Sequence, residues 1–297
     1  MFHRDVDSHL LDPIFTDFGK GFGCGLERLS SEDLLRHQEH VSWERRNFFR
    51  EGYAFGLSAR HVIGRHAGNP ERWNSERGTY RIMHYTGYGF FNGCAESLGM
   101  TRLPEDADSW RDVADYAKFR PFLSGGRSFG RMVRSRVVTR DLLRSFEHEE
   151  TRLLTEAAWH GCGRAFWFRA PAAPEALCRL LELYPPATDC ITWGLGVAMT
   201  LTQIANPDAV ERSLQSMPER FQPTLMRGSG IALAAMVHEN PDQEQRVRSL
   251  YAGRSWYPML DAAIAAFEAS TDDAQVYAAV LDSAASAPAI RLAGTRG

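Results

Sequence analysis

Gly161-Cys162-Gly163-Arg164-Ala165 is one of the three clearest copies of a short glycine-spaced phrase that occurs seven times in this chain of 297 residues. Successive copies begin 31 to 39 residues apart. Such a period is typical of repeat architectures, in which each unit packs mainly on its neighbours. The other copies are Gly194-Leu195-Gly196, Gly228-Ser229-Gly230 and the looser Gly21/Gly23/Gly25, Gly52/Ala54/Gly56, Gly87/Gly89/Phe91 and Gly126/Ser128/Gly130.

The phrase is expected to lie inside helices. After the last copy, apolar residues continue at helical spacing through Leu233 and Val237, which favours a helix over a strand. Glycine in a helix interior costs up to about 1 kcal/mol relative to alanine, so seven copies need a physical reason. Small residues one turn apart allow close approach, either of a neighbouring helix or of a ligand. Tight helix packing is the simpler explanation, and the two are compatible.

A second segment with its own start signal follows each phrase. Asparagine or threonine caps a helix well, proline suits its first position, and an acid there meets the helix dipole. Each unit is therefore expected to pair a glycine-spaced inner helix with a more polar helix antiparallel to it. The start signals are Ser31-Glu32-Asp33, Asn69-Pro70-Glu71, Pro104-Glu105-Asp106, Thr139-Arg140-Asp141, Pro174-Glu175, Asn206-Pro207-Asp208, Asn240-Pro241-Asp242 and Thr271-Asp272-Asp273.

The predicted fold is a single all-α domain over residues 1–297, an array of about seven to eight antiparallel helical hairpins. The array would be an α-solenoid or toroid-like, with repeats over about 15–252, capping helices over about 254–284 and a frayed tail.

Composition limits the functional classes. The net charge is −3, so no global field attracts nucleic acid. The five cysteines are widely spaced without a CxxC pair, so neither a disulfide framework nor a zinc site is expected. No long apolar run predicts a membrane span or signal peptide, and we expect a cytoplasmic protein without metal or cofactor.

When the seven copies are aligned, the positions one, three and five residues after the first glycine are mostly apolar. Polar residues interrupt these three columns. They are Arg127, Asn92, Arg131 and Arg164, all from the third to fifth copies. Polar entries in an apolar column need either solvent or a partner. The middle of the array is therefore either more exposed or holds a polar centre. Glu96 follows Asn92 by one turn and would be a general base if buried, although a solvated glutamate is the simpler reading.

Aromatic side chains gather in the same inner segments, as an apolar ligand site requires, although core packing alone would also explain them. The expected ligand-binding residues are Arg127, Arg164, Tyr88, Phe90, Phe129, Trp167 and Trp193, and the expected catalytic residues are Glu96, Asn92 and Arg131.

Several phrases together are similar to a known family. Glu51-Gly52-Tyr53-Ala54-Phe55-Gly56-Leu57, Thr86-Gly87-Tyr88-Gly89-Phe90, Gly161–Phe168, Tyr184-Pro185-Pro186 and Trp193-Gly194-Leu195-Gly196 resemble the UnbL-type proteins. These bacterial proteins carry a domain of unknown function and often accompany enediyne polyketide biosynthesis genes. The resemblance spans about residues 15–250, while Met83–Thr86 departs from the pattern, as in a divergent member. It implies a pathway and no catalytic residues.

We therefore expect a cofactor-independent protein of bacterial natural-product biosynthesis that binds an apolar intermediate and, if it is an enzyme, cyclises or isomerises it. The alternative is a non-catalytic helical scaffold that binds a pathway protein or peptide. A closed aromatic cavity would favour the first, and an open polar groove the second.

Overall fold

The computed structural model describes residues 8–27, 29–64, 81–100, 116–254, 257, 261, 262, 264 and 265. These residues form twelve α-helices, five short 3-10 helices and no β-strand, so the prediction of an all-helical fold is confirmed. The expected start signals at Asn69, Pro104 and Thr271, and most of the expected capping helices, lie outside the described residues.

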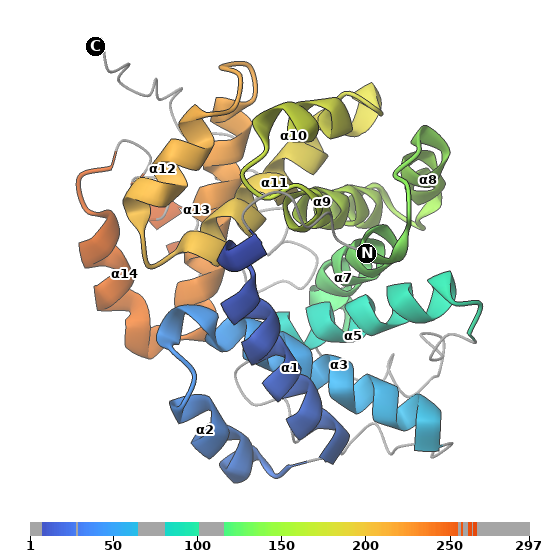
Figure 1. The fold of residues 1–297 in the computed structure, drawn as a ribbon, viewed down its shortest axis with the longest axis vertical. Helices are drawn as coiled ribbons and strands as arrows, with labels where there is room; N and C mark the ends of the chain where they lie inside the picture. Colours follow the sequence, from blue (N-terminus) through green and yellow to red (C-terminus); the bar gives the residue numbers. More distant parts are fainter. Residues whose placement is uncertain are drawn as a thin grey trace.

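The seven glycine-spaced phrases all lie inside α-helices. These are α1 (Asp12–Glu27), α3 (Arg46–Gly64), α5 (Arg81–Ser97), α7 (Tyr116–Arg134), α9 (Arg152–Arg169), α11 (Thr188–Gln203) and α13 (Gln222–Glu239). They pack on one another in chain order, each mainly against the one before and the one after. Figure 1 shows the shorter helices at the periphery: α2 (Ser31–Glu39), α8 (Arg140–Arg144), α10 (Pro174–Leu181), α12 (Pro207–Gln215) and α14 (Glu244–Tyr251).

Most of the phrase glycines lie where neighbouring backbones touch, and Gly23 of α1 is an exception. A Cβ atom on Gly89 of α5 would overlap the carbonyl group of Leu123 in α7, and one on Gly93 would overlap that of Arg127. Since both pairs advance by one turn in the same direction, α5 and α7 run parallel. Equivalent overlaps join the other successive pairs, such as Gly194 of α11 with the carbonyl of His160 in α9. Close approach between helices therefore explains the repeated glycines.

The start signals vary in how they work. Thr139 and Asn206 accept a backbone N–H of the first turn of α8 and α12, as expected. The cap of α2 is Ser30, one residue before the predicted start, and it accepts the N–H of Asp33. Asn240 differs from its sequence copy at Asn206, because its side chain makes no cap bond. A 3-10 turn, Pro241–Gln243, instead precedes α14.

The last glycine helix contacts helices far away in the sequence. Glu239 at the end of α13 is fully buried, and its Oε1 accepts the N–H of Ile82 at the start of α5 (3.0 Å). The buried Arg50 of α3 donates to the Glu239 backbone carbonyl (2.9 Å) and to the Gln38 side chain of α2 (2.8 Å). Asn240 donates to Asn47 of α3 (2.9 Å). Buried polar bonds thus hold the end of the row against its beginning.

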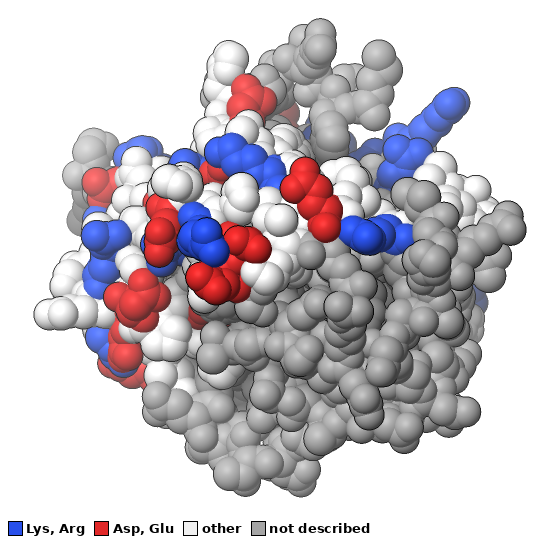
Figure 2. Space-filling model, turned by 90° about the horizontal axis from the view of Figure 1, so that it is seen from below, with Lys and Arg blue, Asp and Glu red and all other residues white. Residues whose placement is uncertain are grey.

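On the part of the face in Figure 2 that the structure describes, neither sign of charge dominates. Acidic and basic side chains lie next to one another on the described part of that face. All five cysteines are free. None of the described helices combines the length and the apolarity that crossing a membrane requires.

Candidate functional site

Five of the glycine helices converge on a small apolar cavity. It has a volume of about 70 Å³ and is partly open to solvent. The phenylalanine rings around it meet edge to face, with ring centroids 4.7 Å apart for Phe90 and Phe129 and 5.5 Å apart for Phe129 and Phe168. The cavity is lined by Ile14, Phe15 and Phe18 of α1, Phe48 and Glu51 of α3, Phe90 of α5, Phe129 and Val133 of α7 and Phe168 of α9.

Glu51 is the single carboxyl group among the described residues that line this cavity. The residue is 8% exposed, and within the described part of the chain no group forms a hydrogen bond with its carboxyl. Burial raises the pKa of Glu51 from 4.5 to about 7, against the opposing charge of Arg164. Because this cavity is partly open, the Glu51 carboxyl is accessible to a small ligand, and near neutral pH it can both accept and release a proton.

Arg164 and His160 lie one turn apart on α9 and supply the other polar groups of this region. The Arg164 guanidinium carbon lies 5.5 Å from the centre of the Phe129 ring. Burial, and secondarily the charge of Arg164, lowers the pKa of His160 to about 3, so its imidazole is neutral at physiological pH. A permanent cation therefore accompanies the buried carboxyl, and the neighbouring histidine adds no charge.

The helical repeat of α7 separates the predicted arginines. Gly125, Phe129 and Val133 succeed one another at four-residue steps, with Phe129 and Val133 on the cavity. Arg127 and Arg131 each follow one of these inner residues by two positions, or about 200° around the helix. They consequently point away from the cavity. The arginines that interrupt the apolar columns thus occupy two sites. Arg164 alone is on the side of Phe129 and Glu51, although it is not part of the cavity lining.

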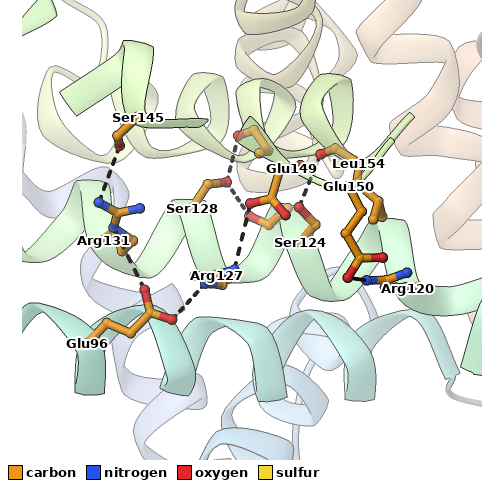
Figure 3. A network of polar contacts seen from close by, with 12 residues as sticks. Glu96, Arg120, Ser124, Arg127, Ser128, Arg131, Ser145, Glu149, Glu150 and Leu154 are labelled. Carbon is orange, nitrogen blue, oxygen red and sulfur yellow. Dashed lines mark hydrogen bonds and ion pairs between the residues drawn. The ribbon is translucent and has the colours of Figure 1, made fainter. Parts of the chain in front are cut away.

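On the outer side, Arg127 and Arg131 belong to an ion-pair network with Glu96 (Figure 3). Arg127 Nε lies 2.7 Å from one Glu96 oxygen, and Arg131 Nε lies 3.9 Å from the other. Glu149 approaches Arg127 at 3.7 Å, and Arg131 donates to the Ser145 hydroxyl (3.3 Å). The candidate base Glu96 is thus held between two guanidinium groups, 13% exposed at its side chain. Whether it has a catalytic role stays a prediction.

The remaining predicted site residues are distributed through the helices. Phe90 and Phe129 line the cavity, as expected for ligand-binding residues. Asn92, Tyr88 and Trp167 are buried away from the cavity lining, and the Trp167 indole donates to Thr202 of α11 (2.8 Å). Trp193 is half-buried on α11 and also lies outside the lining.

Sequence comparison of the columns missed Glu51 because it precedes the first glycine of its copy. Across the seven copies this column reads Lys20, Glu51, Thr86, Gly125, His160, Trp193 and Arg227, without a shared apolar character. No single member is therefore an outlier. The column as a whole could have pointed to Glu51. It is polar in most of the copies, although each member directly precedes a glycine that packs against a neighbouring helix.

The described residues thus define a class of protein: an all-helical fold with a carboxyl group, that of Glu51, in a cavity lined by phenylalanine rings. Among the described residues, no three His, Cys, Asp or Glu side chains are grouped closely enough to hold a metal ion. The chain matches, over residues 3–250, the sequence model of a family described as a protein of unknown function (DUF1702), and it belongs to that family. No curated protein and no solved structure matches the chain significantly.

Proposed function

We propose that this protein binds the apolar end of a natural-product intermediate in the aromatic cavity and moves a proton on it through Glu51. The observation that carries the proposal is the buried Glu51 carboxyl, which has a pKa near 7 and no hydrogen bond from the described residues. Such perturbed groups in apolar clefts are candidates for acid–base catalysis.

The chemistry suited to these groups is isomerisation next to a carbonyl. Ionised Glu51 would take a proton from the carbon beside the carbonyl, leaving the electron pair as an enolate. Arg164 would stabilise the negative oxygen, and Glu51 would return the proton to another carbon of the conjugated system. One C–H bond breaks and another forms, so the step needs no oxidant, reductant or cofactor.

The cavity volume limits what part of the ligand enters. It is about 70 Å³, roughly half the ~150 Å³ of an engineered cavity that admits benzene. The cavity would receive a chain end or the edge of a ring. The rest of the ligand would lie at the mouth, where Phe15 is 42% exposed although it lines the cavity.

Two features support the wider setting. The resemblance to the UnbL-type proteins suggests an enediyne or related polyketide pathway. The successive packing of the glycine helices, with α13 returning to α3 and α5, supports a closed, toroid-like array of hairpins around the cavity. In such an array the ligand would sit inside the ring of inner helices.

Proton exchange tests the proposal directly. The protein would be incubated in D2O with 2-nonanone, an apolar chain with a carbonyl near its end, and deuterium uptake followed by mass spectrometry. We expect exchange beside the carbonyl to be faster than without protein, and Glu51→Gln to slow it by about 100-fold or more.

Glu96→Gln is the matched control, since it removes the same charge from the outer network. It should retain the wild-type exchange rate. Circular dichroism would verify that both variants fold. Equal exchange in wild type and Glu51→Gln, or loss in Glu96→Gln alone, would contradict the assignment of Glu51. Native mass spectrometry of protein from the producing strain would show whether an apolar metabolite co-purifies.

A further inference from the structure

An open groove of about 560 Å³ lies on the outer side of the molecule, away from the cavity. It is formed at the C-terminal ends of α5 and α7, beside the start of α8. Its walls include Glu96, Met100, Arg131, Arg134 and Leu142. The parallel course of α5 and α7, which the glycine contacts between them fix, brings these two helix ends to the same edge.

Positive charge is concentrated along one wall. The stretch from Arg131 to Arg144 contains five arginines and one acidic residue, Asp141. Arg131 is engaged with Glu96 and lies over the Phe146 ring. Arg134 and Arg136 are exposed, and no acidic side chain among the described residues pairs with either. Their charges are thus available to a bound partner.

Three of the exposed apolar side chains belong to the chain segments that form the groove. Five large hydrophobic residues are exposed in the described part of the chain. Met100 (42%) lines the groove, while Leu98 (57%) and Val137 (69%) are within two residues of its lining. Single exposed hydrophobic residues are common, but exposed Met100 in the lining, with Leu98 and Val137 exposed next to lining residues in the chain and arginines beside them, gives this edge the composition of a protein interface.

The arginine-bearing wall is also held in place. Arg169 of α9 donates to the backbone carbonyls of Met132 (2.9 Å), Ser135 (2.7 Å) and Arg136 (3.1 Å). These bonds satisfy carbonyl groups at and beyond the last turn of α7. A surface whose backbone is ordered in advance loses less conformational entropy when a partner binds.

We propose that this groove is the docking site for an acidic segment of a partner protein that also presents apolar side chains. The charge of Arg134 and Arg136 complements carboxylates, and Met100, Leu98 and Val137 complement apolar groups between them. A nucleic acid fits less well, because the basic stretch is short and Glu96 in the wall would repel phosphates. This inference is independent of the proposed chemistry at Glu51.

The test uses a fluorescein-labelled helical peptide, about four turns long, with glutamates on one face and leucines at the next helical positions. Fluorescence anisotropy should detect its binding to the full chain, and the peptide with glutamine for glutamate should bind at least about tenfold more weakly. The Arg134→Gln/Arg136→Gln variant should lose a similar factor, and so should wild type on going from low salt to about 0.3 M.

Arg179→Gln/Arg212→Gln is the matched control, because it removes two exposed arginines from α10 and α12 without touching the groove. It should bind the peptide like wild type. Met100→Ser/Val137→Ser should weaken binding without changing its salt dependence. Equal loss in the control, or binding that does not distinguish glutamate from glutamine, would overturn the proposal.

Two other occupants give different results. The chain segment 101–115 is itself acidic in sequence, with Glu105, Asp106 and Asp108. If the peptide binds only after these three are changed to Asn or Gln, the chain's own segment is the occupant and the partner assignment is wrong. A dimer seen by analytical ultracentrifugation that is lost in Arg134→Gln/Arg136→Gln would instead identify a second copy as the occupant.

Discussion

The central cavity and the outer groove share helix α7, yet they place glutamates in opposite surroundings. On the inner face, Glu51 meets phenylalanine rings and no described hydrogen-bond donor, with a raised pKa. On the outer face, Glu96 lies between Arg127 and Arg131. The first arrangement suits proton transfer, and the second suits ordering of a charged surface. The surroundings of each carboxyl, and with them the role proposed for it, therefore follow from the helix face that it occupies and not from its residue type.

The largest expected effect on stability comes from the loss of one glycine contact between the helices that surround the cavity and their neighbours. A Cβ atom on Gly163 of α9 would overlap the carbonyl of Ile191 in α11, and a backbone group cannot rotate away as a side chain can. We expect Gly163→Ala to lower the free energy of unfolding by about 3 kcal/mol or more, measured by urea denaturation. Since α9 carries Arg164 and Phe168, ketone exchange should fall as well.

Gly23→Ala is the control for this change. No atom of a neighbouring element lies within 4 Å of a Cβ atom at Gly23, although this glycine belongs to the same repeated phrase. Alanine there should increase stability by up to about 1 kcal/mol, its intrinsic advantage within a helix. Similar costs at Gly23 and Gly163 would contradict the assigned helix contacts.

Replacement of each glutamate by methionine should change stability in opposite directions. Glu51→Met removes a buried carboxyl that lacks a hydrogen bond and keeps the side-chain length, so stability should rise by about 1 kcal/mol while exchange is lost. Glu96→Met leaves Arg127 and Arg131 without this carboxylate and should lower stability by about 1–3 kcal/mol. Urea denaturation of both variants tests the contrast, and changes of the same sign would contradict it.

The pH dependence of stability sharpens the comparison further. The folded protein retains a proton on Glu51 between pH 4.5 and about 7, whereas the unfolded chain has released it. The Glu51 contribution to stability should consequently fall as pH rises through this interval, by about 1.4 kcal/mol per pH unit at most, and level off above it. Buried Glu239, with its pKa raised to about 8, adds a slope of the same sign.

Glu51→Gln isolates the contribution of Glu51, because it retains Glu239. Denaturation across pH 4.5 to 8 should show a shallower fall for the variant than for wild type, and the difference in slope should disappear well below pH 4.5, where Glu51 is protonated in both the folded and the unfolded state. Glu96→Gln is the control on the outer face. It retains Glu51, so the fall of stability with pH that Glu51 contributes should be the same as in wild type. Parallel curves of stability against pH for wild type and Glu51→Gln would show that the pKa of the Glu51 carboxyl is not raised in the folded protein.

The sequence predicted the helices and their close contacts better than it predicted the site. Glycines that recur at a fixed period indicate helix interiors and neighbours, because only a backbone contact gives so many helical glycines a purpose. The same columns identified Arg127, Arg131 and Arg164 as exceptions, but the repeat alone did not indicate that the first two face outward. Glu51 has an unremarkable place in its column, and its isolation depends on side chains contributed by five different helices.

The smallest effect should be confined to the groove. Thr139 accepts the N–H of Leu142, a groove residue, and so caps α8. Thr139→Ala should lower stability by about 1 kcal/mol or less and weaken binding of the acidic peptide a few-fold, because α8 starts less regularly. Thr139→Ser should restore both values, since serine caps equally well. Ketone exchange should stay at the wild-type rate in each variant, because α8 contributes no residue to the cavity lining. A parallel loss of exchange and peptide binding would show that the two faces of α7 are coupled, and that the inner and outer sites form one functional unit.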